Sequence, residues 1–186
     1  MRPYADSNLF SRFYLRLSES EETAGLMEAA RAEGTAPLPV SWLHRLEIVN
    51  ALQLYVFAGK GGQIRVTPEQ AASAHATFIT DLREGLFLRS AQVELPALAA
   101  QFEELALRHT AKHGFRTYDL IHVASALILN CDEFWSFDRI HERESAFPTF
   151  GTLICPVRGG ESWPCATSMH SQNKFPIIIP NTLSGP

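Results

Sequence analysis

Short apolar segments alternate with helical stretches along this chain of 186 residues, and this alternation constrains its fold more than any other feature. Helices are indicated where apolar residues recur three or four positions apart, and Gly, Pro and capping residues separate them from extended apolar segments. Parallel strands need long crossover connections, which are usually helical. The pattern therefore predicts an α/β fold, namely a three-layer α/β/α domain with a central, mostly parallel sheet.

The clearest boundary in this pattern is a helix start at Thr67. Thr67 suits the N-cap position, Pro68 suits the first helical position, and Gln70 completes a capping box. The other boundaries depend on apolar periodicity, on glycines that end helices and on acids in first turns. Predicted strands cover residues 3–5, 38–42, 86–95, 131–137 and 152–155, and predicted helices cover residues 7–17, 21–32, 43–58, 68–84, 96–113 and 117–128.

The length of the chain predicts one domain, because it allows one substantial core and is short for two. This domain is expected to cover residues 1–157, because the character of the sequence changes beyond Pro156. Residues 158–186 are rich in Pro, Gly and Ser, show no sustained period, and are predicted to be an irregular tail. The three cysteines lack paired CxxC spacing, which argues against a disulfide framework and a thiolate zinc site. No apolar run approaches the ~18 to 20 residues of a membrane span, so we expect a cytoplasmic protein without a membrane segment.

Four acids stand at element boundaries or in apolar surroundings, although acids are rarely buried unless they are paired or bound to metal. Asp6 and Asp138 end predicted strands, and Glu47 and Asp119 lie near the starts of predicted helices at the same sheet edge. Ligands bind at this carboxyl edge in open α/β sheets. Carboxylates gathered there would repel one another, and oxygen-only ligation of a divalent cation, Mg²⁺ or Mn²⁺, would keep them ionised together. The formal charge of −4 also means that any contact with nucleic acid needs local basic groups or bridging cations.

The sequence around these acids resembles the PIN-domain ribonucleases, above all the VapC-like toxins of bacterial type II toxin–antitoxin systems. The resemblance covers about residues 2–157 and depends on four pieces that occur in order. Residues 4–8 resemble the opening motif, Glu47 matches the helix-borne glutamate, residues 116–126 resemble the third motif, and residues 136–138 resemble the last.

This resemblance implies a metal-dependent endoribonuclease that acts as the toxin and hydrolyses RNA phosphodiesters with metal-activated water. Asp6, Glu47, Asp119 and Asp138 would then hold one or two Mg²⁺ or Mn²⁺ ions. The resemblance also implies a cognate antitoxin as partner and a homodimer. The residues expected to orient these acids or to contact an RNA phosphate are Ser7, Asn8, Arg116, Thr117, His122 and Ser136.

Several of these residues also have a plain structural interpretation. Ser7 and Asn8 suit helix caps, and Asp119 suits the positive end of a helix dipole. His122, which follows Asp119 by three residues on the same helix face, suits an ordinary hydrogen-bonded histidine. The alternative function is a catalytically silent PIN-like scaffold that binds RNA or protein, and the complete set of acids argues against it. An aspartyl-phosphate phosphatase is disfavoured because Asn8 stands where a second acid would be needed.

Overall fold

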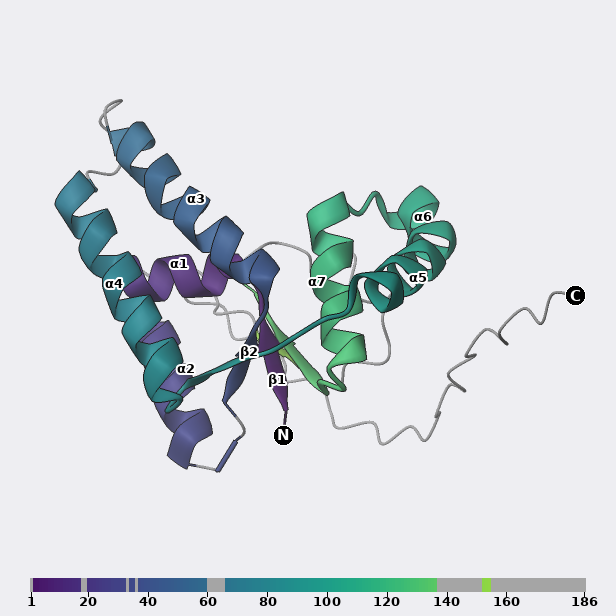
Figure 1. Cartoon of the computed structure of the whole chain (residues 1–186), viewed down its shortest axis with the longest axis horizontal. Helices are drawn as coiled ribbons and strands as arrows, with labels where there is room; N and C mark the ends of the chain where they lie inside the picture. The colour runs from purple at the N-terminus through teal and green to yellow at the C-terminus, as the bar shows by residue number, and fades with distance from the viewer. Residues whose placement is uncertain are drawn as a thin grey trace, which may run out of the picture.

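In the computed structural model, which describes residues 2–17, 20–32, 34–35, 37–59, 66–136 and 152–154, short strands lie between two layers of helices (Figure 1). This arrangement confirms the predicted three-layer α/β/α fold. The strands are β1 (Pro3–Ala5), β2 (Leu38–Val40), β3 (Leu88–Ser90), β4 (Glu133–Trp135) and β5 (Thr152–Ile154).

Every strand pair in the described residues is parallel, as the alternation predicts. Hydrogen bonds join β1, β4 and β5 into one sheet in the order β1-β4-β5, and they join β2 to β3. The two groups meet where β2 contacts β1 (Figure 1). The strand order therefore reverses direction at β1, and a switch of this kind is where open α/β sheets bind their ligands.

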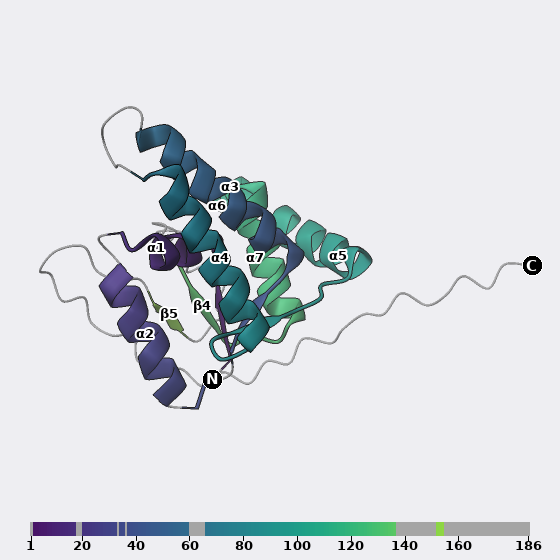
Figure 2. The same cartoon turned by 60° about the vertical axis from the view of Figure 1, so that its left-hand side comes forward.

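The helices divide between the two faces of this strand layer (Figures 1 and 2). The first layer contains α1 (Ser7–Leu15), α2 (Ser20–Ala32), α3 (Trp42–Gly59) and α4 (Pro68–Glu84). The second layer contains α5 (Leu95–Leu105), a π-helical turn (Ala106–Thr110), α6 (Ala111–His113) and α7 (Thr117–Ile128).

The helix boundaries agree with the sequence where local chemistry sets them. The Gln70 amide donates to the Thr67 hydroxyl at 3.2 Å, and the Thr67 amide donates to the Gln70 side chain at 2.8 Å, so the predicted capping box is present. Helix α1 ends two residues before its predicted end, because Arg16 adopts a left-handed conformation with φ 52°. The helix predicted over residues 96–113 is interrupted by the π-helical turn.

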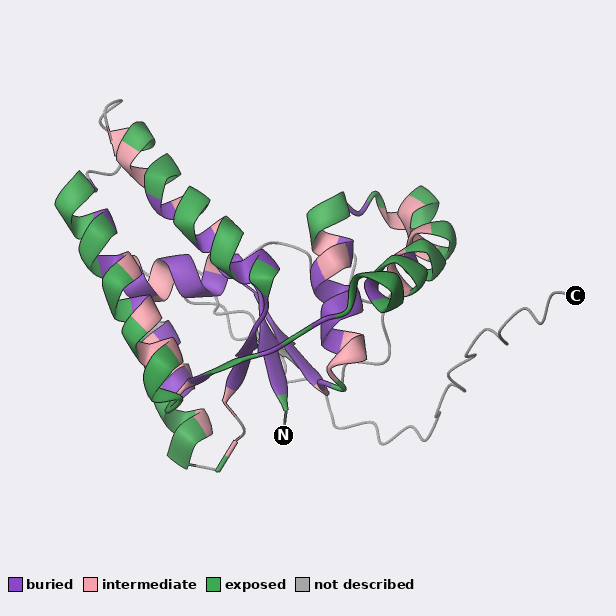
Figure 3. Cartoon of the chain, in the orientation of Figure 1, coloured by how far each residue is buried: buried purple, intermediate pink, exposed green. Residues whose placement is uncertain are grey.

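Two apolar clusters fill the space between the strands and the helical layers, and Figure 3 shows the strands buried between exposed outer helix faces. Consecutive residues of a strand point to opposite faces. Ala5 and Trp135 accordingly belong to the cluster under the first layer, and Tyr4 and Phe134 belong to the cluster under the second. The strands thus connect both clusters and hold the residues that follow them in a fixed place.

None of the described helices combines the length and hydropathy required to cross a lipid bilayer. The predicted domain boundary at residue 157, the tail over residues 158–186 and Asp138 lie outside the described residues.

Candidate functional site

The candidate site begins where β1 and β4 end side by side. Ala5 lies opposite Trp135 in the parallel register, so the next residues, Asp6 and Ser136, emerge together at the carboxyl edge. The backbone amide of Asp6 donates to the Trp135 carbonyl at 3.1 Å, and the Ser136 hydroxyl donates to Asp6 Oδ2 at 2.5 Å. The hydroxyl of Ser136 thus bonds to a carboxylate, that of Asp6, and its expected role at a metal site stays a prediction.

Asp6 also has a structural role, as the N-cap of α1. Its Oδ1 accepts a hydrogen bond from the Leu9 amide at 3.0 Å, which satisfies one of the unpaired donors of the first helical turn. The interpretation of Ser7 and Asn8 as the caps is wrong, because Asp6 has the extended backbone of an N-cap and Ser7 is already the first residue of the helix. Both carboxylate oxygens of the buried Asp6 are thus engaged in hydrogen bonds.

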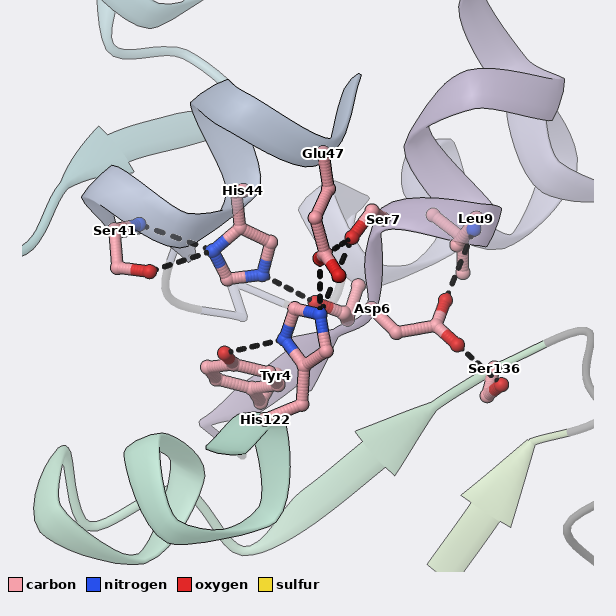
Figure 4. A network of polar contacts seen from close by, with 10 residues as sticks. Tyr4, Asp6, Ser7, Leu9, Ser41, His44, Glu47, His122 and Ser136 are labelled. Carbon is pink, nitrogen blue, oxygen red and sulfur yellow. Dashed lines mark hydrogen bonds and ion pairs between the residues drawn. The ribbon is translucent and has the colours of Figure 1, made fainter. Parts of the chain in front are cut away.

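Three helices bring polar side chains together next to Asp6 (Figure 4). Ser7 in the first turn of α1 donates its hydroxyl to Glu47 Oε2 on α3. His122 on α7 places Nε2 2.6 Å from the same Glu47 oxygen and 3.2 Å from the Ser7 hydroxyl. The His122 side chain is 6% exposed and the Glu47 side chain is 24% exposed, so this carboxylate is within reach of solvent and the imidazole is not.

Tyr4 and His44 lie next to His122 in this group, and the sequence did not indicate the contacts of either residue. The Tyr4 hydroxyl lies 2.9 Å from His122 Nδ1. His44 accepts at Nδ1 from the Ser41 amide at 3.0 Å and donates from Nε2 to the Ala5 carbonyl at 2.8 Å. The only signal for His44 in the sequence is a polar side chain within a mostly apolar stretch, one turn before Glu47.

Burial and the neighbouring groups set the charges in this cluster. Burial alone would raise the pKa of Glu47, but hydrogen bonding and charge attraction from His122, with the Ser7 hydroxyl, lower the pKa below its usual value. Burial, reinforced by the nearby His122, lowers the pKa of His44 to about 3. Burial raises the pKa of Tyr4 well above its usual value. At neutral pH the cluster therefore contains an ionised Glu47, a neutral His44 and a protonated Tyr4.

Asp119 lies one turn before His122 on α7, in the third position of that helix. Its Oδ2 accepts a hydrogen bond from the Arg116 amide at 3.0 Å, which is the local contact expected of an acid at a helix start. Thr117 and Arg116 are exposed beside it. The structural interpretation of Asp119 thus has a contact to support it.

The described residues do not show the predicted acids gathered around one point. The carboxylate of Asp6 points toward Leu9 and Ser136, whereas that of Glu47 points toward Ser7 and His122 (Figure 4). Within the part of the chain that the structure describes, no group of three or more His, Cys, Asp or Glu side chains is placed to hold a metal ion. The oxygen donors present are of the type that Mg²⁺ and Mn²⁺ prefer. The metal site with Asp6, Glu47, Asp119 and Asp138 stays a prediction.

Comparison with known proteins gives a structural likeness and no sequence match. No family model matches the chain, and no curated protein matches it by sequence. The fold is similar to a chain in the crystal structure of VapBC2 from Rickettsia felis bound to a DNA fragment from their promoter, with a TM-score of 0.54. The similarity covers 83% of this chain and 98% of that chain at 12% sequence identity, so it shows a shared α/β fold.

Proposed function

We propose that this protein is a metal-dependent endoribonuclease of the PIN-domain type and the toxin of a type II toxin–antitoxin system. The observation that carries the proposal is the contact between Ser7 and Glu47, which are 40 residues apart. This contact brings the helix-borne glutamate to the residue that follows Asp6, at the switch point of the parallel strands. The likeness of the fold to VapBC2 and the resemblance of the acidic motifs to VapC-like toxins point to the same class.

In the proposed reaction, Asp6, Glu47 and Asp119, with Asp138 from outside the described residues, would hold one or two Mg²⁺ or Mn²⁺ ions. A divalent ion supplies activation of a water molecule and neutralisation of phosphate charge. Ser136 holds the carboxylate of Asp6, and Ser7 and His122 hold that of Glu47. The exposed Arg116, with Asn8 and Thr117, would contact the RNA phosphates.

The proposal includes the partners that VapC-like toxins imply. A cognate antitoxin would bind the chain and block the site, and the chain would form a homodimer. The toxin and its antitoxin would act in the cytoplasm. The name VapBC2 of the similar structure, with its promoter DNA, supports the toxin–antitoxin setting.

One observation favours a second candidate, a PIN-like scaffold that binds RNA or protein without cleavage. Both oxygens of Asp6 and one oxygen of Asp119 take part in hydrogen bonds that stabilise helix starts or strand ends. These bonds would be useful to a scaffold that has no catalytic activity.

Cleavage of total RNA in the presence of Mg²⁺ or Mn²⁺ separates the two candidates. The chain is purified free of partners and compared with Asp6→Asn, Glu47→Gln and Asp119→Asn variants, and with Glu104→Gln as a matched control on the exposed surface of α5. We expect the first three variants to lose activity by about 100-fold or more, because metal assistance contributes several kcal/mol. The control should cleave as the wild type does.

Asn is as good an N-cap as Asp, so a loss of activity in Asp6→Asn would not reflect unfolding of α1. Equal cleavage by the wild type and all variants would contradict the proposal that this chain is the nuclease. Absence of cleavage by the wild type, with retained binding of RNA, would identify the scaffold.

A further inference from the structure

The first turns of α3 carry three large apolar side chains on their outer surface. Trp42, Leu46 and Val49 are 46%, 64% and 41% exposed. Residues three or four positions apart lie on one face of a helix, so these three form a single stripe. Apolar residues scattered singly over a surface are normal in soluble proteins, whereas a continuous apolar patch marks an interaction site.

This stripe borders a groove with a volume of about 600 Å³. The start of α3 forms one wall, and the segment that joins β3 to α5 and runs past that start forms the other (Figure 1). The Ala91 amide donates to the Val40 carbonyl at 2.9 Å, so this segment is held against the end of β2. The buried side chains of Ala91 and Val93 add to the apolar lining. The groove is therefore mostly apolar and is built from elements with fixed places in the fold.

Two opposite charges border the groove on its two walls. Arg45 lies on α3 and Glu94 at the N-cap of α5, and both side chains are exposed. Among the residues that the structure describes, neither side chain forms an ion pair, with the other or with a third residue. Glu94 also makes no capping bond with its side chain. Both charges are thus in place to pair across an interface.

We propose that this groove is the interface between two copies of the chain, in which Arg45 of each copy pairs with Glu94 of the other. A two-fold interface uses the same surface twice, so a contact from one residue to a second is matched by the reverse contact. A surface with one base, one acid and an apolar stripe is complementary to itself under this symmetry. The inference rests on the proposed function for the homodimer, and it names the surface and the charge pair that form it.

The composition of the groove favours a protein over an RNA strand. An RNA strand binds through basic grooves that follow its phosphates and through aromatic side chains on which its bases stack. Trp42 and Arg45 are groups of that kind, but Glu94 would repel a phosphate and the rest of the lining is mostly apolar. Interface cores between proteins are apolar and enriched in aromatic residues and arginine.

Analytical ultracentrifugation of the full chain, without RNA or metal, tests the interface over a range of concentrations. The wild type should approach twice the chain mass of 20.7 kDa. Leu46→Asp should raise the dissociation constant of the dimer by about 100-fold or more, because each copy then buries an unpaired carboxylate. Leu54→Asp is the matched control, since Leu54 is exposed on the same helix and does not line the groove. It should dimerise as the wild type does.

Reversal of the two charges tests the pairing. Arg45→Glu places an acid against Glu94, and Glu94→Arg places a base against Arg45. Each variant alone should weaken the dimer by at least about 10-fold, because like charges then face each other across the interface. The double variant restores opposite charges and should recover most of the lost affinity, because the two changes are coupled. Circular dichroism should be unchanged in all three variants, since both side chains are exposed.

A wild type that stays monomeric overturns the inference, and weaker RNA binding by Leu46→Asp would then assign the groove to RNA. A dimer that survives in Leu46→Asp and in both single charge variants also overturns it, because the interface would lie elsewhere. If Leu46→Asp does not fold, the charge variants decide. A double variant that dimerises no better than the single variants contradicts the pairing of Arg45 with Glu94.

These measurements need no catalysis, so they separate this inference from the nuclease activity. A dimer that passes the charge reversal but cleaves no RNA contradicts the nuclease alone. A monomer that cleaves RNA contradicts this interface alone.

Discussion

His44 and His122 lie with ring centroids 4.9 Å apart, yet they have different functions in the molecule. His44 is fully buried and connects the start of α3 to the end of β1 through the Ala5 carbonyl. His122 contacts a carboxylate that solvent can reach. A buried histidine with only neutral partners is a structural group, whereas one that bonds to an accessible acid can serve a site.

The pKa of His44 predicts that acid destabilises the protein in a defined range. This pKa is lowered from 6.5 to about 3 in the folded chain. Between these pH values His44 is therefore protonated in the unfolded chain and neutral in the folded chain. The free energy of unfolding should therefore fall as the pH decreases through this range, by at most about 1.4 kcal/mol per pH unit. The lowered pKa of Glu47 adds a loss in the same direction, below the usual range of a glutamate.

Urea unfolding of the wild type and of His44→Gln over this pH range measures the effect. Gln keeps a donor for the Ala5 carbonyl and has no proton to gain. Its stability should vary less with pH between 6.5 and 3 than that of the wild type. Identical pH dependence in the two proteins would contradict the assignment to His44.

At the scale of elements, the helix starts differ in how far local sequence determines them. The Thr67 box consists of bonds between residues three apart, so four consecutive residues contain all the information. The cap of α1 is Asp6, which the sequence marks equally well as a strand end and as a candidate ligand. The π-helical turn at Ala106–Thr110 has no marker, because one extra residue in a turn follows from packing.

Thr67→Ala should lower the free energy of unfolding by about 1 kcal/mol, because the Gln70 amide loses its acceptor. Thr77→Ala is the matched control, since Thr77 is exposed within α4 and its hydroxyl donates to the Ser73 carbonyl of its own helix. We expect that control to change stability by less than about 0.5 kcal/mol. Chemical denaturation of both variants measures the difference, and equal effects would show that the capping box contributes nothing.

At the scale of the whole molecule, the strands couple two apolar clusters into one folding unit. Tyr4 and Phe134 pack on one face, and Ala5 and Trp135 pack on the other. A strand cannot leave one cluster and remain in the other. Unfolding of the two helical layers should therefore occur in one cooperative transition.

Phe78→Ala in the first layer and Phe134→Ala beneath the second should each lower stability by about 3 to 5 kcal/mol. Far-UV circular dichroism reports the helices of both layers, and fluorescence includes the buried Trp135 of the first cluster. The two signals should share one midpoint in the wild type and in each variant. Separate midpoints in Phe134→Ala would mean that the layers unfold independently.

The sequence by itself determined the α/β class, the parallel strands, most helix boundaries and the positions of Asp6 and Glu47 near strand ends and helix starts. These features follow from periodicity, caps and turn residues, which act over a few neighbouring positions. The motif resemblance added the proposed activity, and the similarity to VapBC2 supports the fold that it implies.

The tertiary structure alone decided which side chains meet. Ser136 reaches Asp6 across 130 positions, and Tyr4 reaches His122 across 118. No local pattern encodes such contacts, because they depend on which strands are neighbours and on the register in which they pair. Asp119 shows the same limit, since its sequence fits both a ligand and a helix start, and only the tertiary structure reveals its bond to the Arg116 amide.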